Sequence, residues 1–372
     1  MAKDKKNERK SMNLDETIEN LSLSGIKILK LGDKKFEHIE VIPSGSITLD
    51  MALGIGGYPR GRTIEIFGDE MSGKTTLTLI AIAQAQKAGG NACFIDAEHA
   101  ISIDWAKKLG VNIKDLYFLQ PDSGEDALKA VEQLARSNKF DIIVVDSVAA
   151  LAPKAELDGE MEDAHYALLA RLMSKAMNRL TSIVSKSKTA VIFINQNRDK
   201  IGQAWGDKKS QPGGKALKFY ASVRLSVNIV MNSSIKDKNG VKIGHSVHIK
   251  VAKNKCAPPF REGEFVLNFL EGIDNNVEIF ESALTKEIIK LKGKIYSFEK
   301  WNGNREEFKQ LITNDKELKE KLIVKLKRTF EIGGIDDGQI EDDTIDTNAD
   351  DESVKPGKKV KFKLKKDEED FL

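Results

Sequence analysis

Four short and mainly apolar segments constrain the fold of this chain most strongly. They are RTIEIF, NACFIDAE, DIIVVDS and TAVIFINQN, and helix-like segments such as KTTLTLIAIAQAQKAG and EDALKAVEQLARS separate them. Strands that are apolar on both faces need cover on both faces, and their alternation with helices is typical of a parallel sheet. The sequence therefore predicts an α/β fold with a mostly parallel central sheet covered by helices.

The pattern changes after about Ala221. The segments VRLSVNIVM, HSVHIKVAKNK and EFVLNFL predict added antiparallel strands. Beyond about Gly272 follows a smaller, Lys/Glu-rich region with helical signals in SALTKEIIKL, REEFKQLI and KELKEKLIVKLKRTFE, which we expect to form a small α+β C-terminal domain. At the front, the amphipathic LDETIENLSL and the strand-like GIKILKL lie outside the predicted central sheet.

The segment GDEMSGKT, residues 68–75, lies between a predicted strand and a predicted helix and fits the pattern G-x-x-x-x-G-K-[ST]. In such a P-loop the backbone N–H groups surround nucleotide phosphates, the lysine (Lys74) reaches the β- and γ-phosphates, and the hydroxyl (Thr75) binds Mg²⁺. We therefore predict ATP and Mg²⁺ as cofactors. The predicted nucleotide-binding residues are Gly68, Asp69, Glu70, Met71, Ser72, Gly73, Lys74, Thr75 and Thr76.

Three other predicted strands end in polar residues. Asp146 follows DIIVV, Asp96 and Glu98 follow NACFI, and Asn195 and Gln196 follow TAVIFI. Ligands of open parallel sheets bind beyond the carboxyl ends of the strands, so these side chains should converge on the P-loop. There Asp146 would hold Mg²⁺ through water, Glu98 would orient or deprotonate the attacking water, and the amides would contact the γ-phosphate. A helix cap or a surface position is the alternative for each.

The segment NRDKIGQAWGDKKSQPGGKALKF follows Gln196 and is polar, basic and rich in glycine. Mobile basic residues next to an aromatic side chain, here Trp205, suit the backbone and bases of a single-stranded nucleic acid. A surface loop with an incidental tryptophan is the alternative.

Charge is distributed unevenly along the chain. The net charge is +2, but Asp336–Leu372 contains 7 Lys and 13 Asp/Glu, so this tail carries −6 and the remainder +8. The stretch IDDGQIEDDTIDTNADDES has too few large apolar residues to fold, and we predict that the tail is disordered. Such a tail can simply be solvated, or it can compete with an anionic ligand for the basic remainder of the chain, and both interpretations are open.

Cysteine usage and hydropathy favour a cytoplasmic protein without a membrane partner. Cys93 and Cys256 are far apart in the sequence and form no CxxC, so neither a disulfide framework nor a zinc site is predicted. No apolar run approaches membrane-spanning length, and the start MAKDKKNERK lacks the apolar segment of a signal peptide.

Five blocks together resemble the RecA recombinase family: GDEMSGKTTLTL, CFIDAEHA, DIIVVDSVAALAPKAELDGE, IFINQNRDKIG and GGKALKFYASVRL. They occur in order between about Ile26 and Gly272. The resemblance implies a homo-oligomeric helical filament on single-stranded DNA, which pairs that strand with homologous duplex DNA, exchanges strands and hydrolyses ATP. It also implies cellular partners such as single-strand-binding and loader proteins.

The same resemblance implies roles for individual residues. Glu98 corresponds to the catalytic carboxylate, Asp146 to the Walker B acid, and Gln196 to the γ-phosphate sensor. Lys253 and Lys255 correspond to lysines that reach ATP from the neighbouring subunit. The implied catalytic residues are thus Glu98, Lys74, Gln196, Lys253 and Lys255, and Trp105 corresponds to the aromatic residue that stacks on adenine.

For DNA, the resemblance implies a first binding loop at about residues 156–165 and a second at 197–213. Phe219 corresponds to the residue that transmits nucleotide state between subunits. Ser102 replaces an acidic residue near the base, and Asn178 replaces a DNA-contacting arginine, for which we expect Arg179 to substitute. The implied DNA-binding residues are Arg171, Arg179, Asn197, Arg198, Trp205, Gly213 and Gly214.

The expected domains are a polymerisation arm at 1–35, a RecA-type ATPase core at 36–272, a small C-terminal domain at 273–333 and a tail at 334–372. Two other functions fit the P-loop. A ring helicase or translocase would need an arginine finger where VAKNK offers lysines, and a DNA-coating protein with incidental ATP turnover would not need Glu98.

Overall fold

The computed structural model describes residues 13–26, 28, 39–159, 167–199 and 209–329. The chain divides into two units, residues 1–332 and 333–372, and all described residues belong to the first. The predicted disordered tail and most of GIKILKL lie outside the described residues.

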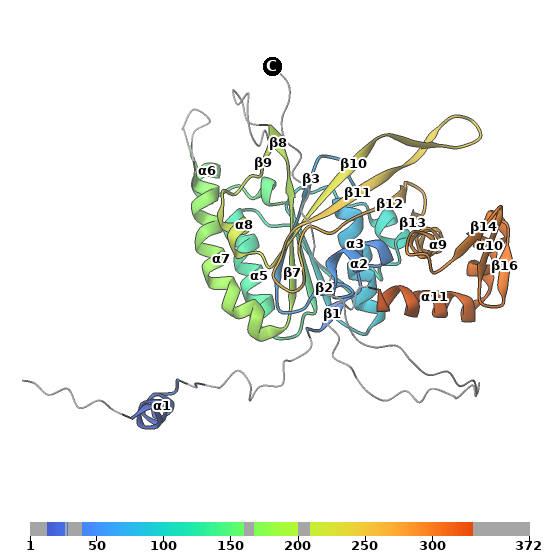
Figure 1. Cartoon of the computed structure of the whole chain (residues 1–372). Coiled ribbons are helices and arrows are strands. Elements are labelled where there is room, and N and C mark those ends of the chain that lie inside the picture. The colour runs from blue at the N-terminus through green and yellow to red at the C-terminus, as the bar shows by residue number, and fades with distance from the viewer. Residues whose placement is uncertain (1–12, 27, 29–38, 160–166, 200–208, 330–372) are drawn as a thin grey trace, which may run out of the picture. The chain divides into compact units, whose positions relative to one another are not determined.

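A nine-stranded sheet forms the centre of the first unit (Figure 1), in the order β13-β12-β11-β10-β3-β7-β6-β4-β5. The six strands from β10 to β5 are parallel, and β11, β12 and β13 continue the sheet in antiparallel fashion. Both parts of the prediction are confirmed. The strands are β3 (Thr63–Gly68), β4 (Ala92–Asp96), β5 (Leu116–Leu119), β6 (Ile142–Asp146), β7 (Ala190–Gln196), β10 (Val223–Lys236), β11 (Lys242–Asn254), β12 (Glu262–Asn268) and β13 (Gly272–Ile273).

Helices cover both faces of this sheet. On one face lie α2 (Ile47–Leu53), α3 (Lys74–Lys87) and α4 (Ile103–Lys108), and on the other α5 (Gly124–Arg136), α7 (Leu168–Ser187) and α8 (Ala216–Tyr220). The long α7 shows why: its buried residues Met173, Met177, Leu180 and Val184 recur at helical spacing and form one apolar stripe. The central strands are thereby buried on both faces, as their apolar sequences predict.

Short elements fill the connections. Helix α1 (Leu14–Leu23) coincides with the amphipathic LDETIENLSL, β1 (Val41–Ile42) pairs with β2 (Tyr58–Pro59), and β8 (Arg198–Asp199) pairs with β9 (Lys209–Ser210). A 3₁₀ turn (Val148–Ala150) and α6 (Lys154–Leu157) follow β6.

The C-terminal region has an apolar core of its own, formed by residues between Ile279 and Leu326. Its three-stranded antiparallel sheet confirms the predicted α+β character. Its elements are α9 (Asn275–Thr285), β14 (Lys290–Lys292), β15 (Ile295–Phe298), β16 (Trp301–Gly303), α10 (Arg305–Asn314) and α11 (Lys316–Arg328).

The helical interpretation of SALTKEIIKL was wrong for its second half. Helix α9 ends at Thr285, and Lys290–Lys292 pairs with β15 instead. Two local features favour the hairpin: Gly293 supplies a left-handed turn (φ +66°), and burial alternates between the buried Ile289 and the exposed Leu291.

Two buried carboxyl groups lie where α2 meets α9. Glu278 of α9 accepts a hydrogen bond from the Ser46 hydroxyl (2.6 Å), and Asp50 of α2 accepts one from the Ser44 N–H (2.9 Å). The pKa of Glu278 is raised from 4.5 to about 7, mainly by burial and in smaller part by the nearby Asp50 charge, whereas the hydrogen bond from Ser46 opposes the shift. The pKa of Asp50 is also raised to about 7, again mainly by burial. The junction is therefore most stable when these carboxyl groups carry protons.

This junction predicts a pH dependence of folding. An acid whose pKa is higher in the folded than in the unfolded chain loses stability as pH rises through the interval between the two values, here from 4.5 to about 7. For Glu278 alone that loss is up to about 3 kcal/mol. Urea unfolding at pH 5 and pH 8 should therefore show a smaller loss in Glu278→Gln than in the unaltered chain. Glu281→Gln, at a partly exposed position of the same helix where the carboxylate pairs with Arg305, is the matched control. Equal losses in all three proteins would contradict this account.

Candidate functional site

The backbone of the P-loop leaves no room for side chains at two of its glycines. A Cβ on Gly68 would lie 1.9 Å from the carbonyl oxygen of Val227 in β10. Gly73 precedes α3 with φ +94°, and a Cβ there would lie 2.7 Å from Leu267. Because only glycine fits these positions, the loop can turn sharply from β3 into the N-terminus of α3, where free N–H groups favour anions.

Some polar side chains of the P-loop form hydrogen bonds within the loop, and at least one does not. Lys74 is 7% exposed and donates to the Asp69 carbonyl (2.6 Å). Burial lowers the pKa of Lys74, and the charges of Asp146 and Glu98 oppose this shift. The Ser72 hydroxyl is buried and has no hydrogen-bond partner among the residues that the structure describes. Such a cradle fits a phosphate group, which would accept bonds that the protein itself does not complete.

Thr75 and Asp146 meet beside the loop, as predicted. The Thr75 hydroxyl donates to Asp146 Oδ2 at 2.6 Å. The pKa of Asp146 is raised to about 6, mainly by burial and also by the charges of Glu98 and Asp96, whereas the bond from Thr75 opposes the shift. A hydroxyl next to a cluster of repelling carboxylates fits a hard cation such as Mg²⁺, whose charge would relieve that repulsion.

Glu98 and Gln196 come together from different strands. Gln196 Nε2 donates to Glu98 Oε1 at 2.8 Å, and the Ser147 hydroxyl donates to the same oxygen. The N–H of Glu98 donates to the Asp146 carbonyl (3.2 Å), which joins the ends of β4 and β6. The ends of β3, β4, β6 and β7 thus form one site, as the strand-end argument predicts.

Asp96 has a different place from its neighbour Glu98. It accepts hydrogen bonds from the N–H groups of Ala100 and Ile101 and from the side chain of Gln120, each at 3.3 Å. Asp96 therefore shapes the turn that carries Glu98.

Trp105 lies against the first turn of α3. Its indole N–H donates to the Thr76 hydroxyl at 3.2 Å, and the ring is half-buried. Ser102 caps α4 by accepting a bond from the Trp105 N–H (3.3 Å). A serine can therefore serve as the helix cap at the position where the family resemblance implies an acid.

The P-loop is bonded to both ends of the predicted second DNA-binding loop. The carboxylate of Asp69 accepts from Asn197 Nδ2 (2.9 Å) and from Lys209 Nζ (2.7 Å), and Gln211 donates to Asn197 (3.0 Å). The hydrogen bond from Lys209 lowers the pKa of Asp69. Asn197 and Lys209 flank residues 200–208. These residues, which include Trp205, lie outside the described residues. A change at the phosphates can therefore reach this loop through one carboxylate.

A buried polar network in the central sheet bonds residues at the end of the predicted second DNA-binding loop. Glu65 of β3 pairs with Arg224 of β10 (2.5 Å), and Asn195 donates to Glu65 (3.1 Å) and to the Pro212 carbonyl (3.1 Å). Arg224 also reaches Gln211 (3.4 Å). This network was not predicted from the sequence. It could have been predicted from the charged residues Glu65 and Arg224, each of which lies in a mainly apolar strand, RTIEIF and SVRLSV.

The predicted glycines at the end of the second loop pack against helix α7. Gly213 and Gly214 have φ of +84° and +72°, and their Cβ atoms would lie 2.9 Å from Val148 and 2.8 Å from Ala170. Larger residues would displace the loop from α7.

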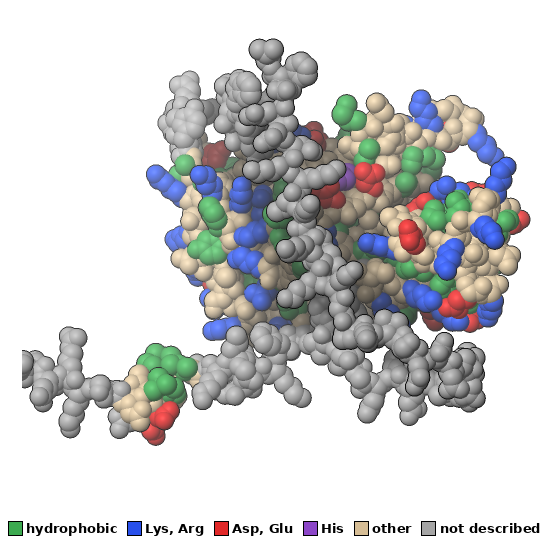
Figure 2. All heavy atoms as spheres, viewed as in Figure 1, with side chains coloured by type: hydrophobic (Ala, Val, Ile, Leu, Met, Phe, Trp, Pro, Cys, Tyr) green, Lys and Arg blue, Asp and Glu red, His purple; other side chains and the backbone are tan. Residues whose placement is uncertain are grey.

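Arg171 and Arg179 take different positions on α7. Figure 2 shows Lys and Arg side chains gathered on the side of the molecule where this helix lies. Arg171 is exposed in the first turns of α7. Arg179 bonds Glu132 of α5 at 2.8 Å. Its substitution for the arginine replaced by Asn178 stays a prediction, and DNA would have to compete with Glu132 for it. Arg198 is exposed in β8.

Lys253 and Lys255 lie away from the P-loop of their own chain. In the sheet Lys253 of β11 pairs with Arg224 of β10, and Arg224 pairs with Glu65 of β3. Lys253 is therefore two strands away from β3, at the level of Glu65, which lies three residues before Gly68. Its ammonium group donates to the carbonyl oxygens of Lys218 (2.9 Å) and Phe219 (2.7 Å). Phe219 itself is 66% exposed. Lys255 is exposed and Lys253 is partly exposed, so their role at a neighbouring subunit stays a prediction.

Comparison with known proteins decides the family. A model of the RecA N-terminal domain matches residues 13–274. Protein RecA of Caldanaerobacter subterraneus subsp. tengcongensis is 51% identical over 307 residues, which cover 82% of this chain and 89% of that relative. The chain belongs to the RecA family. Protein RecA of Campylobacter jejuni is 49% identical over 342 residues, covering 91% and 98% of the two chains. For Bacteroides thetaiotaomicron the identity is 53% over 297 residues, covering 79% and 89%.

The resemblance drawn from the sequence is therefore confirmed. As a RecA protein, the chain is a DNA-dependent ATPase that acts in homologous recombination by strand exchange. Proteins of this family use ATP, bind DNA and form filaments. This assignment replaces the helicase and coating-protein interpretations. In the described part of the chain, the helices are too short or too polar to cross a membrane.

The bond between Lys209 and Asp69 predicts a coupling defect. In Lys209→Ala we expect single-stranded DNA to stimulate ATP hydrolysis about fivefold less than in the unaltered chain, because a coupling of about 1 kcal/mol is lost. The DNA-independent rate should stay the same. Lys175→Ala, an exposed lysine on α7, is the control. The idea fails if Lys209→Ala retains full stimulation by DNA.

Proposed function

We propose that ATP is hydrolysed where β3, β4, β6 and β7 end, with Glu98 as the base that orients or deprotonates the attacking water. The observation that supports this most strongly is the Gln196–Glu98 hydrogen bond (2.8 Å) beside the Thr75–Asp146 bond (2.6 Å). It joins the residue proposed to activate water with the residue proposed to contact the γ-phosphate. Ser147 holds the same carboxylate oxygen and so orients Glu98.

The P-loop would hold the triphosphate. The N–H groups of residues 68–75 and of the N-terminus of α3 would donate hydrogen bonds to the phosphate oxygens. Lys74 would neutralise charge on the β- and γ-phosphates. Thr75 and, through water, Asp146 would hold Mg²⁺, which would neutralise phosphate charge when bound. Trp105, fixed against Thr76 at 3.2 Å, provides a surface on which the adenine stacks.

Gln196 would report on the nucleotide. With ATP bound, its amide turns from Glu98 toward the γ-phosphate, and β7 leads directly through Asn197 into the second DNA-binding loop. Asp69 is bonded to both ends of that loop. The loop would therefore adopt its DNA-binding form with ATP and release DNA after hydrolysis.

We propose that each ATP lies between two subunits of a helical filament. Lys253 and Lys255 of one subunit would stabilise the charge on the γ-phosphate held by the P-loop of the next, with Phe219 at the same surface. Residues 1–35 would form the arm that docks on the adjacent subunit, 36–272 the ATPase core, and 273–333 a separate small domain. Assembly and nucleotide state are then coupled because neither subunit contains a complete site.

The DNA partners would be a single strand and a homologous duplex. Arg171, Asn197, Arg198 and Trp205 would contact the backbone and bases of the single strand, with Gly213 and Gly214 allowing the close approach of the loop to α7. Single-strand-binding and loader proteins are the expected cellular partners, and the acidic tail would restrain duplex binding.

Removing the proposed base should separate binding from turnover. Glu98→Gln retains a side chain that can bond Gln196 and Ser147, but it cannot accept a proton. We expect the hydrolysis rate to fall by about 10²- to 10⁴-fold while the ATP-bound filament becomes long-lived on single-stranded DNA. Filament lifetime by fluorescence anisotropy and phosphate release are the two measurements. Glu306→Gln, an exposed acid on α10, is the control. Normal turnover in Glu98→Gln would refute the assignment of the base.

Mixing two inactive variants tests the shared site. Glu98→Gln protein lacks the base, and Lys253→Ala protein lacks the neighbouring cation. In an equimolar mixed filament about one interface in four combines an intact Glu98 with an intact Lys253, because the interface is head-to-tail. We therefore expect the mixture to recover up to about a quarter of the normal ATPase rate. If the mixture is no more active than the average of its components, the site lies within one subunit.

A further inference from the structure

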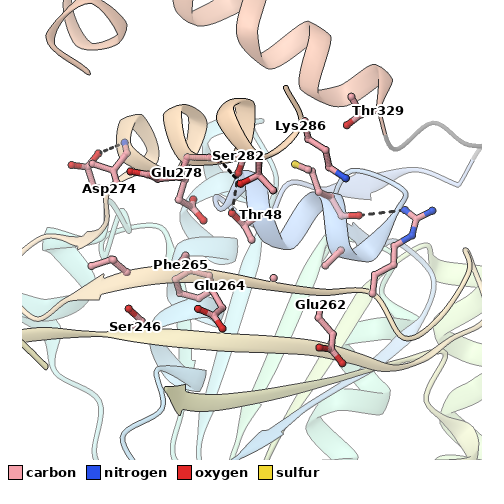
Figure 3. A pocket seen from close by; sticks show the side chains of 18 residues that line it. Thr48, Ser246, Glu262, Glu264, Phe265, Asp274, Glu278, Ser282, Lys286 and Thr329 are labelled. Atoms are coloured by element: carbon pink, nitrogen blue, oxygen red, sulfur yellow. Dashed lines mark hydrogen bonds between the residues drawn. The ribbon is translucent and has the colours of Figure 1, made fainter. Parts of the chain in front are cut away.

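A groove of about 610 Å³ lies away from the nucleotide site, between α9 and the outer strand β12 (Figure 3). Its walls come from α2, α9 and β12, and all its lining residues belong to the first unit of the chain. A groove of this volume is large enough for a small organic molecule.

The contacts of α2 show which residues lie at each end of the groove. Ser46, the N-cap of α2, donates to Glu278 of α9 (2.6 Å), whereas the Met51 carbonyl near the end of α2 accepts from Arg261 (3.4 Å). Lys286 directly follows α9 and is eight residues beyond Glu278, which is about 12 Å along a helix axis. Figure 3 shows Glu278 and Lys286 at different ends of the groove.

Strand β12 forms the opposite wall and has the same polarity. A Cβ on Gly263 would lie 2.5 Å from Thr48, in the middle of the groove. Arg261 comes before this point, and Glu264 follows it, about 10 Å from Arg261 along an extended strand. Figure 3 shows Glu264 on the wall opposite Glu278, so the two acids share one end of the groove.

The other acids of the groove already have partners within the chain. Glu262 pairs with Lys250 (2.6 Å), and Glu281 pairs with Arg305 (2.5 Å). Asp274 caps α9 by accepting hydrogen bonds from two N–H groups of the first turn (2.9 and 3.1 Å).

Four charged side chains of the groove lack such compensation. Glu264, Arg261 and Lys286 form no ion pair with any residue that the structure describes. Glu278 is 5% exposed, and its Oε2 has no hydrogen-bond partner in the same part of the chain. Its side chain is directed from α9 toward β12 (Figure 3). Two uncompensated acids therefore lie at one end of the groove and two uncompensated bases at the other.

We propose that this groove binds a small molecule that carries a guanidinium group at one end and a carboxylate at the other, joined by an apolar chain. The planar guanidinium would donate to Glu278 and Glu264 at once, which an ammonium group does less well. The carboxylate would accept from Lys286 and Arg261. The apolar chain would lie along the middle of the groove, beside Met51.

Such a ligand would connect two parts of the chain. Glu278 and Lys286 belong to the helix that begins the small C-terminal domain, whereas Arg261 and Glu264 belong to the outer edge of the central sheet. A molecule with both charges should therefore bind more tightly than one with either charge alone.

Three related compounds test the proposal in the full-length chain. The first, 5-guanidinopentanoate, carries both charges; pentylguanidine lacks the carboxylate, and 5-ureidopentanoate lacks the cation. By isothermal titration calorimetry we expect a Kd on the order of 1 mM or below for the first compound. The other two should bind at least about tenfold more weakly, because each loses one set of charge-assisted hydrogen bonds.

Variants at exposed positions test whether the groove is the site. Glu264→Gln and Lys286→Gln should each weaken binding of 5-guanidinopentanoate about tenfold. Glu306→Gln and Lys290→Gln make the same changes at exposed positions outside the groove and should leave the Kd unaltered.

Methyl NMR locates the bound compound directly. The resonance of Met51, in the groove wall, should shift on addition of 5-guanidinopentanoate, and that of Met71, exposed in the P-loop, should not.

Three results would overturn the proposal. The first is a Met51 resonance that does not shift at a saturating concentration of 5-guanidinopentanoate. The second is equally tight binding of pentylguanidine, which would show that only the acids matter. The third is an unaltered Kd in both Glu264→Gln and Lys286→Gln.

Discussion

The parallel pairing of β3, β7, β6 and β4 is the constraint on which the rest of the structure depends. It brings four carboxyl ends to one edge of the sheet, so that a lysine, a threonine, two acids and an amide from separate parts of the chain become neighbours. The close contact of Gly68 with Val227 fixes the P-loop at that edge. A shift of one residue in any of these pairings would move the chemical groups to the other face of the sheet.

Electrostatics explains why this edge needs a ligand. Asp146 is buried near Glu98 and Asp96, and its raised pKa of about 6 shows that the folded chain disfavours its charge. A bound cation would relieve that repulsion, just as phosphates would satisfy the N-terminus of α3. The Glu65–Arg224 pair bonds Asn195 and Gln211, which lie near the two ends of the predicted second DNA-binding loop.

Sequence patterns predicted the elements and the strand-end residues, because apolar periodicity and the P-loop spacing are local signals. They did not predict the bonds of Asp69, whose partners Asn197 and Lys209 are 128 and 140 residues away. Nor did they predict β14, because Ile288–Lys292 has helical propensity and only its pairing with β15 makes it a strand. The implied role of Lys253 at a neighbouring subunit stays a prediction, because within its own chain its ammonium group donates only to the carbonyl oxygens of Lys218 and Phe219.

The most direct test of this account is whether the phosphate site controls the second DNA-binding loop in the absence of DNA. The chain has three tryptophans. With Trp105→Phe, only Trp205 of that loop and Trp301 remain, and Trp301 is 7% exposed and bonded to Asp315 in the small domain. Adding a non-hydrolysable ATP analogue should change the fluorescence of Trp205, and ADP should produce a smaller change. Identical emission with the analogue, with ADP and without nucleotide would contradict the coupling between the P-loop and the loop that binds DNA.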